Sequence, residues 1–144
     1  MSSSDSIITY GSTAALPSFQ HVGASAYSFE ETIDRLKRAI ESEDLWLIHE
    51  INPQMLLKRS GFEIPPARQL LFFHPRYMKK LLSIDPNALI EAPLKLVVMQ
   101  MPDDTISVRY LNVEMQFNRY NGFEKLSEEL AMVCKRLIGS IMAQ

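Results

Sequence analysis

The sequence predicts an α+β fold, in which the helices of a single domain pack against a mixed β-sheet of about five strands. Short apolar runs such as Leu70–Phe73 have the length of buried strands. Two longer segments repeat apolar residues at helical spacing, and Pro, Gly and Asn residues separate the elements. The chain has 144 residues, the length of one domain. We therefore expect residues 17–144 to form a single domain and residues 1–16 to be a mobile N-terminal tail.

The composition argues against several classes of protein. The formal net charge is −2, without the basic excess by which nucleic-acid-binding proteins neutralise phosphates. Cys134 is the only cysteine, so neither an internal disulfide nor a paired-cysteine metal site can form. Residues 1–16 lack the basic and apolar regions of a signal peptide, and no apolar run approaches the roughly 18–20 residues that span a bilayer. We expect a cytoplasmic protein that binds neither nucleic acid nor a membrane.

The first two elements are a strand within residues 17–27 and a helix over residues 28–40. The strand carries small residues, including Gly23, which predict a close neighbour, either a helix or a second subunit. Ser28 and Glu31 have the spacing of a capping box, in which the hydroxyl accepts from the amide of Glu31 while the carboxylate reaches back. Apolar residues then recur at helical spacing, so one face of this helix should pack on the core.

A strand, a short helix and a second strand follow, over residues 45–51, 53–60 and 68–73. Asn52 can cap the helix, and Pro53 suits its first position. This order is typical of a βαβ unit, whose two strands run parallel. The expected parallel pair is the reason that the predicted sheet is mixed.

The rest of the chain predicts further helices and a C-terminal hairpin. A helix begins at Pro75, and a loop with a hydrophobic interior covers residues 87–93. After it we expect strands over 94–101 and 105–110, a short helix over 112–120 and a long helix over 123–142. On the long helix, Met132, Ile138 and Met142 widen the apolar stripe, which indicates either a homodimer surface or additional core burial.

The order of these elements resembles the bacterial and archaeal domain-of-unknown-function family 302, from about Pro17 to the C-terminus. The resemblance rests on SFEETIDRLKRAI from Ser28, HEIN from His49, RQLLFFHP from Arg68, IDPNALIEAPLKLVV from Ile84, and the closing long helix. It implies an α+β fold with a mixed sheet, dimeric members and no established biochemical role. Asn52 stands where the family commonly has Asp, and Phe73-His74 where it commonly has Cys-Asn. A ligand of those family positions would therefore be bound differently here, or not at all.

The candidate site lies where the two parallel strands are expected to end. Ligands of open α/β sheets collect at the carboxyl ends of parallel strands, which would bring the segment from His49 to Asn52 close to His74. Two imidazoles and a carboxylate suit a transition metal, so the candidate metal ligands are His74, His49 and Glu50. The alternative is that both histidines make ordinary hydrogen bonds at strand ends. His74 and Met78 are also a pair that can ligate haem, although a helix beginning after His74 would turn its side chain aside.

Basic side chains cluster after this strand end. Arg76, Lys79 and Lys80 follow His74, and Arg68 lies one strand away. They predict a site for an anionic ligand, with a solvated basic face as the alternative. The full set of candidate ligand-binding residues is His74, His49, Asn52, Arg68, Arg76 and Tyr77.

Taken together, the sequence indicates a homodimeric protein that binds a small ligand or a partner, and no catalytic residue can be named. Cys134 lies beside the apolar stripe of the long helix and is interpreted as a small buried hydrophobe. The chain contains no nucleophile-elbow or Walker motif. A metal- or haem-binding protein or enzyme that uses His74 and His49 is the alternative. The residues do not identify a cofactor or a ligand.

Overall fold

The structure is a computed structural model that describes residues 6–12 and 15–143. Its helices and strands are, in chain order, β1 (Gln20–Ala24), α1 (Phe29–Ser42), β2 (Trp46–Ile51), α2 (Pro53–Arg59), β3 (Ala67–Phe73), α3 (Pro75–Ile84), the 3-10 helix η2 (Pro86–Glu91), β4 (Leu94–Gln100), β5 (Ile106–Leu111), α4 (Val113–Phe117) and α5 (Glu124–Gly139). Every element longer than six residues lies close to a predicted one, and η2 occupies most of the segment that was expected to be a loop.

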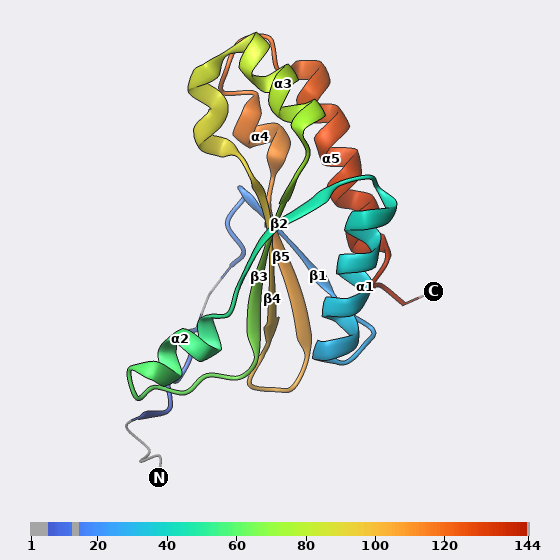
Figure 1. Ribbon diagram of the computed structural model, residues 1–144. Helices are drawn as coiled ribbons and strands as arrows, with labels where there is room; N and C mark the ends of the chain where they lie inside the picture. Colours follow the sequence, from blue (N-terminus) through green and yellow to red (C-terminus); the bar gives the residue numbers. More distant parts are fainter. Residues whose placement is uncertain (1–5, 13–14, 144) are drawn as a thin grey trace.

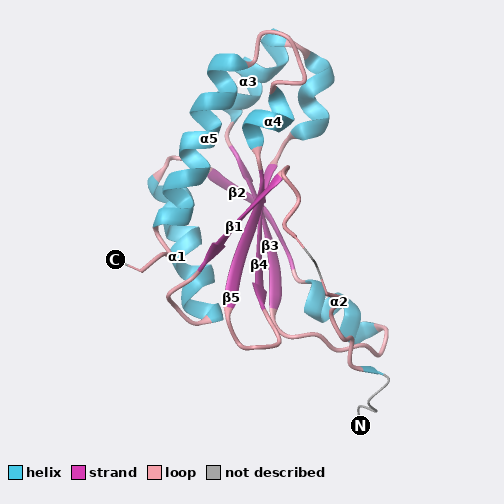
Figure 2. Cartoon of the chain, turned by 180° about the vertical axis from the view of Figure 1, so that it is seen from behind, coloured by secondary structure: helices cyan, strands magenta, loops and turns pink. Residues whose placement is uncertain are grey.

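The strands form one sheet in the order β1-β5-β4-β3-β2, which confirms the α+β fold. Figures 1 and 2 show α1 and α5 along one side of the sheet, while α3 and α4 lie beyond one of its ends and α2 beyond the other. The predicted C-terminal hairpin is present, because β4 and β5 pair antiparallel with Val97 opposite Arg109. Among the described residues, no helix is both long enough and apolar enough to cross a membrane.

The core fills the space between the sheet and the two long helices. Leu96 and Val98 of the central strand β4 are completely buried, and they belong to one apolar cluster with Leu36 of α1 and Leu137 of α5. Full burial of a side chain of this size contributes about 1.5–3 kcal/mol relative to exposure. The helical periodicity of the sequence therefore identified the two faces that cover the sheet.

The predicted parallel pair is wrong, because β2 and β3 pair antiparallel and every strand pair of the sheet is antiparallel. A parallel connection needs a crossover that packs across the face of the sheet. Here α2 has no buried residue and lies at the end of the sheet, so the chain turns back instead of crossing over. Met55 and Leu56, which gave the helix an apolar appearance, are 52% and 49% exposed.

The N-terminus of α1 forms half of the predicted capping box. The hydroxyl of Ser28 accepts a hydrogen bond from the amide of Glu31 at 3.2 Å. The carboxylate of Glu31 does not reach back, since it forms ion pairs with Arg35 at 3.0 Å and Arg38 at 3.4 Å. Ion pairs with the following turns compete with the capping geometry at this exposed position.

A single carboxylate fastens η2 to α4. The side chain of Glu91 is only 11% exposed. It accepts hydrogen bonds from the Tyr120 hydroxyl at 2.6 Å, from Arg119 at 3.1 Å and from the Gln116 amide at 2.9 Å. Because a nearly buried carboxylate needs such donors, this cluster fixes the end of the expected loop against the helix that follows β5.

The wide apolar stripe of the last helix divides into core and surface. Ile138 is 5% exposed and belongs to the core, whereas Met132 and Met142 are each 48% exposed. The stripe is therefore explained in part by additional core burial, and two methionines remain on the surface.

The described part of the predicted tail makes backbone contacts with the domain. Residue Ile7 forms a parallel bridge with Glu63, and the amide of Ile8 donates to the carbonyl of Glu63 at 2.9 Å. Residues 1–5 and 13–14 lie outside the described residues.

Gly23 marks a close approach between the sheet and α5, as its small size predicted. A Cβ atom at this position would lie 2.9 Å from Cγ2 of Ile138. The neighbour that the sequence left open is therefore a helix of the same chain.

Replacing Gly23 with alanine should lower the free energy of unfolding by about 1–3 kcal/mol, because the side chain of Ile138 or the helix that carries it must shift. Urea denaturation measures this change. In the Ile138→Ala background the same replacement should cost less, since the clashing methyl group is gone. Gly139→Ala serves as the control, because an added Cβ there meets no atom within 4 Å. Equal costs in both backgrounds would contradict the proposed contact.

Candidate functional site

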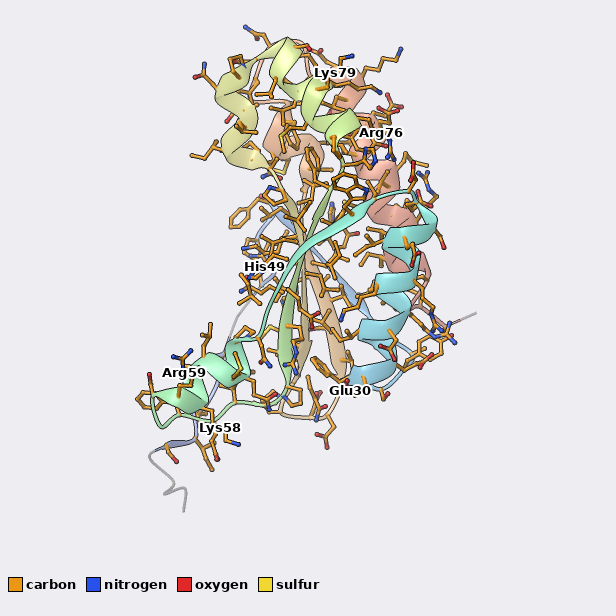
Figure 3. The ribbon with its side chains drawn as sticks, viewed as in Figure 1. Glu30, His49, Lys58, Arg59, Arg76 and Lys79 are labelled. Carbon is orange, nitrogen blue, oxygen red and sulfur yellow. The ribbon has the colours of Figure 1, made fainter. Side chains whose placement is uncertain are left out.

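The antiparallel pairing separates residues that parallel strands would have brought together. In the register of β2 and β3, His49 lies opposite Leu71, and Trp46 lies opposite the last residue of β3. His74 follows β3 and is thus near the start of β2, about three residues or roughly 10 Å along the strand from His49. His49 and Glu50 are consecutive and point to opposite faces of the sheet. Figure 3 shows His49 well away from Arg76, which lies two residues after His74.

The expected metal cluster is therefore not formed. Within residues 6–12 and 15–143, no three His, Cys, Asp or Glu side chains are grouped so that they could hold a metal ion. The predicted grouping of His74, His49 and Glu50 required β2 and β3 to run parallel. Their antiparallel pairing keeps His74 apart from His49 and Glu50.

At one end of the pair, the predicted ligand residues Asn52 and Arg68 form a closed polar network with Glu50. Nη1 of Arg68 donates to Oδ1 of Asn52 at 2.8 Å, and its Nε lies 3.8 Å from Oε2 of Glu50. The other carboxylate oxygen of Glu50 pairs with Lys37 at 2.6 Å. Oδ1 of Asn52 also accepts from the amide of Met55 at 3.0 Å and so caps α2. These groups satisfy one another, and they join α1, α2, β2 and β3.

At the other end, His74 and Arg76 hold the start of α3. Nδ1 of His74 accepts from the amide of Arg76 at 3.0 Å, and the ring lies edge-on to Trp46 with centroids 5.2 Å apart. As an acceptor, Nδ1 leaves the ring proton on Nε2. The Arg76 guanidinium donates to two main-chain carbonyls of the α1–β2 turn and lies 4.6 Å from the centre of the buried Tyr77 ring. The predicted alternative, ordinary strand-end hydrogen bonding, describes His74 well.

The face of the sheet turned away from α1 and α5 is mostly apolar, and we call it the open face. It includes Val22, His49, Ile51, Gln69, Leu71, Lys95, Val97, Met99, Arg109 and Leu111. The uncovered face of an antiparallel sheet usually carries polar residues, whereas Leu71, Val97 and Met99 lie here on the central strands, half-buried. The chain before β1 runs along this side of the sheet, with Leu16 and Phe19 exposed (Figures 1 and 2).

One row of the open face crosses all the strands of the sheet. Its neighbours in register are Ile51, Gln69, Val97, Arg109 and Val22. The row is symmetric about Val97, with a polar residue on each side and an apolar residue at each end. The side chains of Gln69 and Arg109 have no hydrogen-bond or ion-pair partner in the described part of the chain, although both residues are half-buried. A half-buried arginine side chain without a partner is uncommon on a surface that meets only solvent.

A groove between β5, α4 and α5 is lined by titratable side chains and by the thiol of Cys134. Its volume is about 510 Å³, and its lining includes His21, Tyr110, Glu128, Lys135 and Cys134. Burial raises the pKa of Cys134 to about 12, so the thiol stays protonated at neutral pH and is a poor nucleophile. The pKa of Tyr110 is also raised, first by burial and then by the neighbouring Cys134. This outcome agrees with the interpretation of Cys134 as a small buried hydrophobe.

Sequence reasoning missed both the open face and its symmetric row. The apolar run of β4, Leu96–Met99, was a usable signal, because strands with apolar residues on both faces are expected to be covered on both. The row itself depends on strand register, which only the three-dimensional structure supplies.

Comparison with known proteins identifies a family and a fold. The profile of the family described as "Domain of unknown function DUF302" matches residues 21–142. The crystal structure of an uncharacterized conserved protein DUF302 from Bacillus stearothermophilus is similar, with a TM-score of 0.76 and 19% sequence identity, over 87% of this chain and 97% of that chain. No curated protein matches the chain.

The network around Arg68 predicts that Asn52→Ala destabilises the protein more than Asn112→Ala. Both asparagines cap a helix, at 3.0 Å in α2 and 3.1 Å in α4. Loss of a cap costs about 1 kcal/mol. Asn52→Ala should cost about 1 kcal/mol more, because Arg68 also loses its acceptor. Equal losses in thermal or urea denaturation would show that the Arg68 contact adds nothing.

The buried thiol predicts a loss of stability at alkaline pH. The folded protein keeps the proton of Cys134, while the unfolded chain releases it above about pH 9, so folding becomes less favourable as the pH rises. The slope should be about 1.4 kcal/mol per pH unit between pH 9 and 11. Urea denaturation at several pH values measures it, and Cys134→Ala should lack this component. Identical slopes for both proteins would refute the assignment.

Proposed function

We propose that this chain, which belongs to the DUF302 family of domains of unknown function, acts as a homodimer that binds a small ligand. The observation that carries the homodimer is the apolar open face, with a half-buried Arg109 that has no partner among the described residues. Exposed apolar surface of this kind is typical of protein–protein interfaces. In the dimer, two open faces pack on each other as the two sheets of a sandwich.

The symmetric row supports a second copy of this chain as the occupant of the open face. A twofold contact is isologous, so that residue i meets residue j and residue j meets residue i. A twofold axis along β4 places Val97 against the partner's Val97, Ile51 against the partner's Val22 and Gln69 against the partner's Arg109. Each apolar residue then meets an apolar residue, and each unpaired polar group gains a hydrogen-bonding partner. The exposed Phe19 and Leu111, 52% and 43% accessible, would extend the interface.

The chemistry of the described polar residues supports a binding role. Cys134 is buried and protonated, and the polar groups around Arg68 and His74 are engaged with one another. The grooves beside α5, in contrast, contain side chains that could meet a ligand. The ligand-binding part of the proposal is therefore placed at these grooves.

The proposed pairing predicts that Gln69→Arg breaks the dimer, because it sets two arginines against each other across the interface. Light scattering coupled to size exclusion should give twice the chain mass of 16.5 kDa for the wild type at micromolar concentration, and the chain mass for Gln69→Arg. The swapped variant Gln69→Arg/Arg109→Gln should restore the dimer, because each arginine again meets a glutamine.

The matched control is Gln100→Arg, which makes the same replacement at the far end of β4, opposite Ile106. It should remain dimeric. A wild-type protein that is monomeric at these concentrations contradicts the homodimer. A dimer that survives Gln69→Arg contradicts the pairing through the open face.

A further inference from the structure

The groove between α3 and α5 has the composition of a binding site for an anion with an apolar body. Its volume is about 810 Å³, within the range of small-molecule sites. The residues that matter here are Arg76, Lys79, Lys80, Ile84, Lys125 and Leu126. In Figure 3, Arg76 and Lys79 lie along the part of α3 that borders α5. We propose that this groove binds a soluble organic phosphomonoester, which names the ligand class for the ligand-binding part of the proposed function and rests on that part alone.

Two of the groove's cations are available to a ligand. Lys80 pairs with Glu129 at 3.3 Å, and Arg76 is held by the carbonyls of the α1–β2 turn. The side-chain ammonium groups of Lys79 and Lys125 have no ion-pair or hydrogen-bond partner among the described residues. The groove thus concentrates positive charge in a chain whose formal net charge is −2.

The floor of the groove is apolar. Ile84 is 39% exposed and Leu126 is almost completely buried. Gly122, with φ of +88°, has no side chain, and a Cβ there would lie 3.2 Å from Cγ2 of Ile84. The aliphatic stems of the surrounding lysines add further apolar surface below their charged ends. An inorganic anion would use the charges and leave this floor unused.

A phosphomonoester fits this combination better than a carboxylate does. A phosphate carries about −1.5 to −2 charges at pH 7 and can engage two lysines at once. The planar fork of arginine suits carboxylate and phosphate alike, and Arg76 is already engaged. The lysines act as point charges, so they attract the higher charge of a phosphate more strongly than the single charge of a carboxylate. The groove beside α4 does not favour anions over cations in this way, because its lining contains Glu114 and Glu128 as well as Lys135.

Hexyl phosphate tests the proposal on the full chain labelled with ¹⁵N, at about 0.15 M salt. We expect saturable shifts of the Gly122 and Lys125 amides, and binding at least severalfold tighter than that of inorganic phosphate or hexanoate. Each lysine variant, Lys79→Ala or Lys125→Ala, should raise the Kd about 2–5-fold. Lys79→Glu/Lys125→Glu should abolish the saturable shifts.

The matched control is Lys58→Glu/Arg59→Glu, which makes the same charge change on α2 at the other end of the molecule (Figure 3). It should bind hexyl phosphate like the wild type. Light scattering on the same samples reports the dimer separately, so loss of binding in a protein that keeps its oligomeric state concerns the groove only.

The remaining outcomes overturn the assignment. No saturable shift below about 10 mM hexyl phosphate removes the site. Equal affinity for inorganic phosphate removes the role of the apolar floor. Binding only to anionic lipid vesicles or to a single-stranded oligonucleotide assigns the basic residues to a different class of ligand.

Discussion

The sheet has two apolar faces and helices on only one of them, and the rest of the structure depends on this constraint. On the covered face, α1 and α5 bury the side chains of β4 and β5, and the fold's stability is concentrated there. The other face carries Leu71, Val97 and Met99, which no helix covers. In the part of the chain that the structure describes, no second helical layer covers this surface, and we have proposed that a second copy of the chain does.

Local patterns in the sequence were sufficient to predict the elements, but not the direction in which they pair. The cap at Ser28, the turn after β4 and the apolar face of α5 depend on neighbours a few positions away, and each lies where it was predicted. Whether β2 and β3 run parallel depends on where the connecting helix packs. A helix of seven residues with apolar character looks the same in the sequence whether it crosses the sheet or lies beyond its end. The candidate metal site failed for this single reason.

Polar residues in this protein fall into two groups, which residue type alone does not separate. Arg68, Glu91 and His74 are engaged with partners inside the chain, and they hold elements together. Arg109 and Lys125 have no such partners among the described residues. Arg68 and His74 of the first group gave the stronger sequence signals, because they stand beside strand ends and prolines. The second group becomes visible only when the partners of every charged side chain are known, and it is the group that can meet another molecule.

The edge strand β2 carries a further consequence. Its outer edge is unpaired, and its first three residues, from Trp46 to Ile48, are all more than a third exposed. A regular apolar strand at such a position is a template for the endless addition of further strands. The register shift between Leu47 and His49 places a bulge in this strand, which twists it and interrupts the even spacing of its backbone groups. Such a bulge works against the edge-to-edge addition of further strands at this apolar edge.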